Sequence, residues 1–372
     1  MKLFDVYPLY DVMPVRANGC YVYDEKGTEY LDVYGGHAVM SIGHGHPHYV
    51  KRLTEQLANI GFYSNAVQNP LQQQVADKLG KLSGCDTYEL FFVSSGAEAN
   101  ENALKLASFA TGKSKIVAFK NGFHGRTSAT VAATDNASIV SPLNAQHEVA
   151  ILKLGDLEAL EKTLSNEDCC AVIVEFIQGV GGLDISTQEF YKEASTLCKK
   201  YNTKFIADEV QSGFGRSGDF FAFQKYGIEP DIITMAKGMG NGFPVGGILV
   251  HPSIKAKYGM LGTTFGGNHL ACAATLAVLE VLEQENLMKN AREMEVRFRE
   301  SAAKLNLKVK GRGLMLGLDL GFEVGELRKK LIYDHHIFTG GAKNKNVLRI
   351  LPPLNIENEH FDTLFTALKK EL

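Results

Sequence analysis

The sequence predicts an α/β fold, with a mostly parallel central sheet in a large domain and a smaller α+β domain after it. Three observations indicate this fold. From residue 88 onward, short apolar runs rich in β-branched residues alternate with helical patterns, as in βαβ units. Several of these runs end in a charged residue followed by glycines, which is typical of buried parallel strands at the carboxyl edge of a sheet. After about residue 268, two long helical runs replace the alternation and indicate a second domain.

The elements follow in order along the chain. Residues 19–34 predict a hairpin, and helical patterns follow at 48–59 and 70–82. The strand-like runs of the sheet are 89–94, 115–119, 170–177, 205–210, 232–235 and 247–250, and helical runs at 97–110, 157–164 and 188–201 lie between several of them. The remaining elements are helical runs at 268–284, 286–305 and 357–371 and short strands at 315–320 and 347–350.

We expect three parts of the chain. Residues 1–45 would form an N-terminal segment that packs with the small domain, residues 46–267 the large domain, and residues 268–372 the small domain. No linker rich in proline or serine marks the boundary.

Composition excludes several classes of protein. The chain of 372 residues has a formal net charge of -3, which gives no reason to expect nucleic acid or an anionic membrane as a partner. No apolar run reaches the length of a membrane span, and the first residues lack the long apolar region of a signal peptide. The 6 cysteines show no CxxC spacing, so we expect reduced cysteines and a cytoplasmic location.

Asp208 and Lys237 are the leading candidates for catalysis. Each residue follows an apolar, β-branched run and precedes glycines, so each is expected at the carboxyl edge of the sheet. A lysine and a carboxylate from separate strand ends suit a pyridoxal phosphate (PLP) site. The amine can form a Schiff base with the aldehyde, and the carboxylate can keep the pyridine nitrogen protonated. On its own, the pair is also compatible with a plain salt bridge.

Two glycine loops can hold a phosphate. Ser95, Gly96 and Ala97 stand where a strand passes into a helix, so backbone N–H groups there attract an anion, which the glycine lets approach closely. Thr263 and Thr264 place two hydroxyl groups in a second glycine loop before a long helix. Ordinary helix capping by serine or threonine is the alternative for either loop.

Four more residues are candidates for the same site. Phe123 and Arg126 lie in a glycine loop, where the ring can stack on a flat cofactor and the guanidinium can bind a substrate carboxylate. Glu175 ends a buried strand and needs a partner, which Arg349 in a later apolar run can supply. The alternatives are a surface turn for Arg126 and a half-exposed edge position for Arg349.

The histidines at positions 44, 46 and 48 are the right ligand type for a metal, but glycine and proline separate them and no cysteine or aspartate cluster accompanies them. We therefore predict no metal site. The glycine run at 238–242 is not a P-loop, since no lysine followed by serine or threonine comes after it.

Taken together, the chain resembles the class III aminotransferases of PLP fold type I, and most closely the acetylornithine and succinylornithine aminotransferases and their relative ornithine aminotransferase. The resemblance covers nearly the whole chain. The blocks that carry it include Ser-Gly-Ala-Glu-Ala-Asn at 95–100, Gly-Phe-His-Gly-Arg at 122–126, Asp-Glu-Val-Gln at 208–211, Ala-Lys-Gly at 236–238 and Gly-Thr-Thr-Phe-Gly-Gly-Asn at 262–268.

The resemblance implies a role for each residue at the cofactor ring. Lys237 would bind the cofactor covalently and, once the substrate amine displaces it, shuttle the proton between substrate and cofactor. Asp208 would pair with the pyridine nitrogen. Gln211 would lie by the phenolic oxygen, and Val210 and Phe123 would lie against the two ring faces.

The resemblance also implies how the phosphate is held. Ser95, Gly96 and Ala97 would bind it, mainly through backbone N–H groups. Thr264 would reach the phosphate of the neighbouring subunit, which implies a homodimer with shared active sites.

The implied reaction is transfer of the terminal amine of an N-acylornithine to 2-oxoglutarate in arginine biosynthesis, which gives an N-acylglutamate semialdehyde and glutamate. Arg349 would bind the α-carboxylate of glutamate and Arg126 its side-chain carboxylate, whereas the acylornithine would extend towards Arg126 and Thr263. Glu175 would mask Arg349 when no carboxylate needs it. Ornithine or 4-aminobutyrate transamination and a PLP aminomutase are the alternatives.

Three residues near the implied site depart from the pattern of the family. Phe176 and Val180 stand where many relatives have proline and glutamate, and His269 stands where proline is usual. The choice between an acetyl and a succinyl group therefore stays open.

Overall fold

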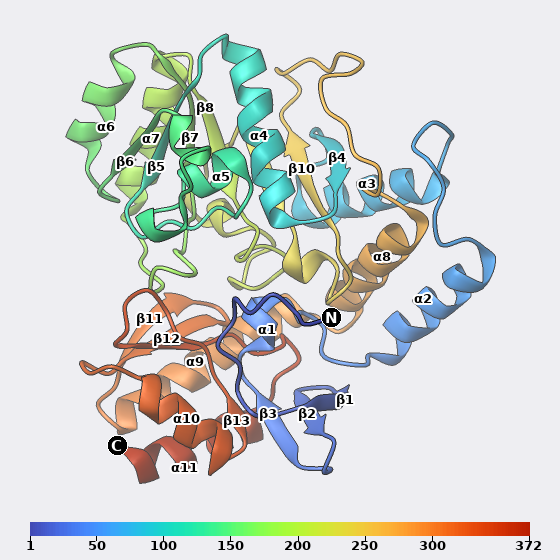
Figure 1. Cartoon of the computed structure of the whole chain (residues 1–372), viewed down its shortest axis with the longest axis vertical. Helices are drawn as coiled ribbons and strands as arrows, with labels where there is room; N and C mark the ends of the chain where they lie inside the picture. Colours follow the sequence, from blue (N-terminus) through green and yellow to red (C-terminus); the bar gives the residue numbers. More distant parts are fainter.

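The computed structural model describes all residues from 1 to 372. A central sheet of seven strands, with the order β4-β10-β9-β8-β7-β5-β6, fills the upper part of the molecule in Figure 1. Its strands are β4 (Glu89–Val93), β5 (Lys115–Phe119), β6 (Val149–Leu152), β7 (Cys169–Val174), β8 (Lys204–Asp208), β9 (Ile232–Met235) and β10 (Gly246–Val250). Only β10 runs antiparallel to its neighbours, so the prediction of a mostly parallel sheet is confirmed.

The sheet is covered on both faces because its strands are apolar at consecutive positions, as expected for a parallel sheet. In β7, Ile173 belongs to the core cluster that contains residues of α4 (Gly96–Thr111), whereas Val172 belongs to the larger core that includes residues of α7 (Gln188–Lys200). The alternation follows from the two-residue period of a strand. The sheet is therefore rigid where its carboxyl edge presents side chains.

The other helices of this part are α2 (Pro47–Asn59), α3 (Pro70–Ser83), α5 (Ser128–Ala132), α6 (Leu157–Leu164) and α8 (His269–Gln284). Both α2 and α3 pack against α8, which lies beside the sheet. Short 3₁₀ turns occur at Ala137–Ile139, Asn144–Gln146, Ala222–Tyr226 and Lys237–Met239. None of the helices combines the length and the apolar composition that crossing a lipid bilayer needs.

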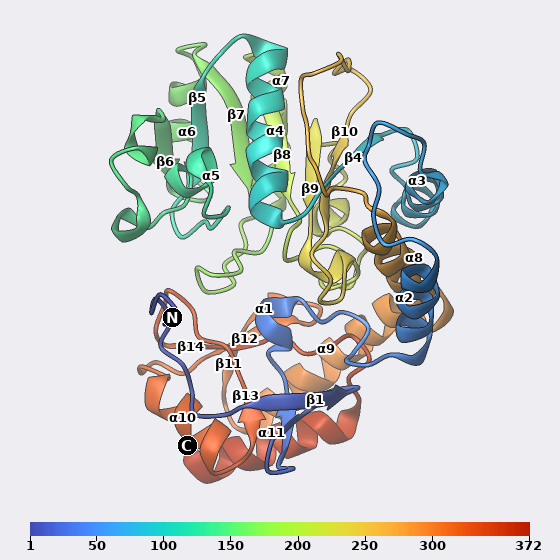
Figure 2. The same cartoon turned by 45° about the vertical axis from the view of Figure 1, so that its right-hand side comes forward.

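Two smaller sheets lie on the other side of the carboxyl edge (Figure 2). One contains β1 (Pro14–Asn18), β2 (Tyr21–Asp24), β3 (Glu29–Asp32) and β13 (Ile337–Phe338), and the other contains β11 (Lys308–Arg312), β12 (Met315–Asp319) and β14 (Val347–Ile350). The predicted N-terminal hairpin thus shares a sheet with a C-terminal strand, because β3 pairs in parallel with β13. Helices α9 (Leu287–Lys304), α10 (Gly325–Tyr333) and α11 (Asn358–Glu371) complete this part. The domain boundaries themselves stay a prediction.

A short turn, α1 (Gly35–Ala38), connects the hairpin to the rest of the chain. All four of its residues have positive φ, including His37 at 69° and Ala38 at 62°. A left-handed turn is costly for residues that carry a Cβ atom, and such strain is concentrated at functional sites. This turn lies between the two parts of the molecule (Figure 1).

The structure differs from the sequence-based expectation in several elements. Strands β1, β6, β11 and β13 and helices α1, α5 and α10 were not expected, and β7 and β8 end earlier than predicted, at Val174 and Asp208. Glu175 therefore follows its strand as the first loop residue, and Lys237 begins a 3₁₀ turn two residues after β9.

Candidate active site

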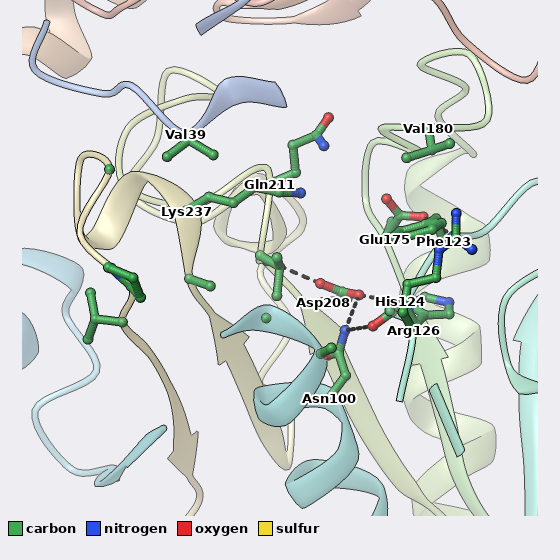
Figure 3. A pocket seen from close by; sticks show the side chains of 18 of the residues that line it. Val39, Asn100, Phe123, His124, Arg126, Glu175, Val180, Asp208, Gln211 and Lys237 are labelled. Atoms are coloured by element: carbon green, nitrogen blue, oxygen red, sulfur yellow. Dashed lines mark hydrogen bonds and ion pairs between the residues drawn. The ribbon is translucent and has the colours of Figure 1, made fainter. Parts of the chain in front are cut away.

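A cavity of about 330 Å³ opens at the carboxyl edge of the central sheet. Among the predicted residues, it is lined by Gly96, Ala97, Phe123, Arg126, Glu175, Asp208, Val210, Gln211 and Lys237. These residues come from the ends of four strands and the start of one helix (Figure 3). Ser95 lies directly before the lining residues of α4, whereas Thr263, Thr264 and Arg349 do not line the cavity.

Asp208 is buried and saturated with hydrogen bonds. Its Oδ2 atom accepts from Asn100 Nδ2 and lies 2.8 Å from His124 Nδ1, and its Oδ1 atom accepts from the Val210 N–H at 3.1 Å. Burial lowers the pKa of His124, but the hydrogen bond and the charge of Asp208 outweigh burial, so the pKa is raised overall.

Sequence reasoning assigned no role to Asn100 or His124, although both contact Asp208 (Figure 3). Asn100 stands one turn into α4, on the same side as Gly96, and its Nδ2 atom also donates to the His124 carbonyl at 2.7 Å. A polar residue at a buried helix position next to a glycine loop was the available signal.

Lys237 extends across the cavity from the opposite side (Figure 3). Its backbone has a φ of 48°, in the left-handed region that residues other than glycine seldom adopt. Burial lowers the pKa of its ammonium group to about 8, although the charges of Asp208 and Glu175 oppose this shift. An amine with this pKa is partly neutral, and therefore nucleophilic, near neutral pH.

The start of α4 can approach Val210 closely only because residue 96 is glycine. A Cβ atom on Gly96 would lie 2.5 Å from Val210 Cγ1. The N–H groups of Gly96 and Ala97 belong to the first helical turn and have no partner within the helix. Ser95 caps α4, because its side chain accepts from the Glu98 N–H at 3.2 Å.

Two buried polar atoms beside the cavity have no hydrogen-bond partner in the protein. They are Gln211 Oε1 and Asn100 Oδ1. Unpaired buried polar atoms are rare and indicate a missing ligand or water. Together with the glycine cradle and the buried carboxyl group of Asp208, they fit a flat, phosphorylated heteroaromatic cofactor that carries oxygen and nitrogen on its ring.

The loop that contains Phe123 and Arg126 lies against the start of α4. Phe123 lines the cavity, and its N–H donates to Glu175 Oε2 at 2.9 Å. Arg126 is exposed at the same cavity and forms no ion pair with a carboxylate of the protein. Burial raises the pKa of Glu175.

The predicted pairing of Glu175 with Arg349 is wrong as a direct contact. Glu175 Oε1 accepts from the Gly179 N–H at 2.9 Å, whereas Arg349 Nη1 donates to the Gly179 carbonyl at 2.9 Å. The peptide backbone at Gly179 thus lies between the two side chains. Arg349 is 3% exposed on β14, so it also lacks the half-exposed edge position given as the alternative.

Thr263 and Thr264 lie outside this cavity. Thr263 Oγ1 accepts from the Gly266 N–H at 3.0 Å within the loop, and Thr264 is exposed. Asn268 caps α8, so the alternative that these threonines cap the helix is wrong. The three histidines of the 44–48 segment each pair with a different carboxylate, from Asp32, Glu285 and Glu280.

Comparison with known proteins identifies relatives along the whole chain. The family model described as aminotransferase class-III matches residues 6–372. An acetylornithine aminotransferase of Archaeoglobus fulgidus is 40% identical over 97% of this chain and 95% of that relative. Another from Aquifex aeolicus is 38% identical over 100% of this chain and 99% of that relative.

A solved structure supports the same fold. The ornithine aminotransferase of Toxoplasma gondii aligns with a TM-score of 0.90 and 27% identity, covering 98% of this chain and 90% of that chain. A second structure of that enzyme, with the same TM-score of 0.90, is described as having partial occupancy of PLP at its active site.

Proposed function

The chain belongs to the class III aminotransferases, and on that premise we propose that it transfers the terminal amine of an N-acylornithine to 2-oxoglutarate with the help of pyridoxal phosphate. The products are an N-acylglutamate semialdehyde and glutamate, and the reaction serves arginine biosynthesis. The relatives named acetylornithine aminotransferase support this substrate, because their identity of 38–40% extends over almost the full length of the chains.

The residues around the cavity fit the proposed cofactor. Gly96 and Ala97 would bind the phosphate with their N–H groups, with Ser95 ordering the helix start through its cap. Val210 and Phe123 would enclose the ring between them, and Gln211 would offer its side chain to the phenolic oxygen. When bound, the cofactor withdraws electrons from the substrate carbon that carries the amine.

Asp208 would hold a proton on the pyridine nitrogen. Its Oδ2 atom is fixed by Asn100 and His124, so the carboxylate does not have to reorganise during the reaction. The observation that carries the proposal is this buried carboxyl group, which lines the same cavity as the lysine (Figure 3).

Lys237 would supply the nucleophile and the proton carrier. Its Nζ atom, with a pKa of about 8, can give up a proton to become nucleophilic and can take one from the substrate carbon.

Arg126, Arg349 and Thr263 would bind the substrates. Arg349 would meet the α-carboxylate of glutamate, Arg126 its side-chain carboxylate, and the acylornithine would extend towards Arg126 and Thr263. Glu175 would influence Arg349 through Gly179, since both side chains bond to that residue. The acyl group, acetyl or succinyl, is open because Phe176 and Val180 replace residues that many relatives carry.

We also propose a cytoplasmic homodimer in which Thr264 reaches the phosphate site of the second subunit. Three features of the exposed surface support the dimer. Thr264 is exposed, α2 has no buried residue, and the exposed rings of Phe62 and Phe265 contact each other with centroids 5.3 Å apart. Exposed apolar surface of this kind favours association.

Half-reactions test the proposal. The purified enzyme, loaded with PLP, is mixed with N-acetylornithine, N-succinylornithine, ornithine or 4-aminobutyrate, and the cofactor absorbance is followed in a stopped-flow instrument. We expect an N-acylornithine to react fastest and 2-oxoglutarate to restore the spectrum. A faster reaction with free ornithine would favour an ornithine aminotransferase, which the likeness to the Toxoplasma gondii structure makes the second candidate.

A further inference from the structure

Two arginines beside the active site have no carboxylate partner. Arg349 donates to the carbonyl groups of Gly341 and Gly179. Arg328, on α10, donates from Nε and Nη2 to the Thr339 carbonyl at 3.3 and 3.0 Å. Carbonyl groups satisfy the donors but do not neutralise the charge, so partly buried guanidinium groups of this kind favour an anion.

A pair of glycines makes room for this cluster. A Cβ atom on Gly340 would lie 2.6 Å from a ring carbon of Tyr34 and 3.1 Å from Arg349 Cβ, and one on Gly341 would lie 2.8 Å from Arg328 Nη1. Any larger residue at these two positions would displace the surrounding side chains. The two arginines and the phenol ring therefore gather around one short stretch of backbone.

His37 completes the cluster from the left-handed turn. Its ring nitrogen Nδ1 lies 2.5 Å from the Tyr34 hydroxyl group. Partial burial, followed by the charges of Arg349, Lys237 and Arg328, lowers the pKa of His37 to about 4. The imidazole is therefore neutral at physiological pH, and it can donate a hydrogen bond without adding to the positive charge.

The cluster adjoins the catalytic cavity through the same segment of chain. Val39, two residues after His37, lines that cavity (Figure 3). The left-handed backbone of α1 is strained, and such strain persists at ligand-binding sites.

We propose that Arg328, Tyr34 and His37 form a carboxylate-binding subsite beside Arg349. The inference rests on the proposed transamination and deepens it. In that reaction Arg349 would meet the α-carboxylate of glutamate, whereas the acylornithine would extend towards Arg126 and Thr263. The added subsite adjoins Arg349, so it would supply a second cation for the α-carboxylate of the dicarboxylate substrate. The carboxylate of the N-acylornithine is the other source of the same chemical group, and the experiment below separates the two.

Binding of two unreactive probes to the PLP-loaded enzyme tests the subsite. Glutarate is a dicarboxylate without amine or ketone, and N-acetylnorvaline is N-acetylornithine without its terminal amine. Their dissociation constants are measured by isothermal titration calorimetry. The variant is Arg328→Gln, and the matched control is Lys329→Gln, which removes the same charge from the next residue of α10, where the side chain is exposed and pairs with Glu326.

We expect Arg328→Gln to weaken glutarate binding about 10- to 100-fold, as for loss of a charged hydrogen bond, and Lys329→Gln to leave it unchanged. Weaker binding of N-acetylnorvaline instead would assign the subsite to the N-acylornithine. His37→Asn keeps the test valid if Arg328→Gln does not fold, because asparagine tolerates the left-handed backbone, and it should weaken the same probe.

Unchanged dissociation constants for both probes in both variants would overturn the subsite. So would a lower melting temperature with unchanged binding, because Arg328 would then only hold Thr339 and the ring of Tyr10, which lies 5.7 Å away. Failure of the proposed function would look different. The wild-type enzyme would show no half-reaction with N-acylornithines, yet it would still bind a probe that Arg328→Gln binds weakly.

Discussion

The two sides of the carboxyl edge treat charge in opposite ways. On the central sheet, the Asp208 carboxylate is buried and takes hydrogen bonds from Asn100, His124 and its own loop. On the side of the smaller sheets, the guanidinium group of Arg349 is equally buried but meets only carbonyl oxygens. A cofactor that never leaves needs a fixed partner, whereas substrates that alternate need charges that are free to accept them. We therefore expect the cofactor at the saturated side and the substrates at the unpaired side.

The largest effect on turnover is expected when Lys237, the nucleophile on the saturated side, is replaced. Lys237→Ala should lower turnover by about 10⁴-fold or more, because both the covalent attachment and the proton transfer are lost. The absorbance band of the PLP-loaded enzyme near the visible edge should disappear as well. The control Lys225→Ala, at an exposed lysine, should keep both. A persisting band in Lys237→Ala would assign the attachment to another lysine.

Removing the charge of Asp208 is the next test. Asp208→Asn keeps the shape of the side chain but leaves His124 without its counter-charge, so turnover should fall about 10³-fold. The pKa of His124, read by NMR, should fall at the same time, because burial would no longer be opposed. If turnover stayed within a factor of about three, the fixed carboxylate would have no special role at this side of the cavity.

The pH dependence of cofactor uptake tests whether burial lowers the pKa of Lys237. Burial lowers the pKa of Lys237 to about 8, so the neutral amine becomes more abundant as the pH rises through that value. The rate at which the apo-enzyme takes up PLP should therefore rise roughly tenfold per pH unit below pH 8 and level off above it. A plateau reached only near the ordinary lysine pKa of 10.5 would contradict this burial effect.

The smallest effect is expected at the boundary between the two sides. Glu175→Ala removes the acceptor for the N–H groups of Phe123 and Gly179, and the Gly179 carbonyl accepts a hydrogen bond from Arg349. The rate of the glutamate half-reaction should rise by a few fold relative to the rate of the N-acylornithine half-reaction. This change corresponds to roughly the free energy of one hydrogen bond. Single-turnover absorbance measures the ratio, and an unchanged ratio would mean that Gly179 does not connect the two residues.

Much of the saturated side could be predicted from the sequence. Asp208 and Lys237 follow strand patterns, and parallel strands bring their carboxyl ends to one edge, so local pattern and topology together place these residues. Asn100 and His124 could not be assigned, because their role depends on which loop lies over which helix. The short strand β6 was missed because its four residues carry little periodic signal.

The unpaired side was harder to predict. Glu175 and Arg349 come from separate sheets, and only the fold reveals that the backbone of Gly179 separates them. Arg328 gave no signal at all, since an arginine in a helix is ordinary. Only the structure shows that Arg328 lies next to Gly341, where a Cβ atom would come within 2.8 Å of Arg328 Nη1.

The pairing of β3 with β13 has a consequence for how the chain folds. Leu31 finds its partner Ile337 almost a whole chain length later, so the N-terminal hairpin cannot complete its sheet until synthesis is nearly finished. During that interval the hairpin carries an unpaired edge, which is a template for pairing with other chains. Contacts so distant along the sequence also slow folding. The segment that carries His37 would thus be among the last parts of the enzyme to reach its final position.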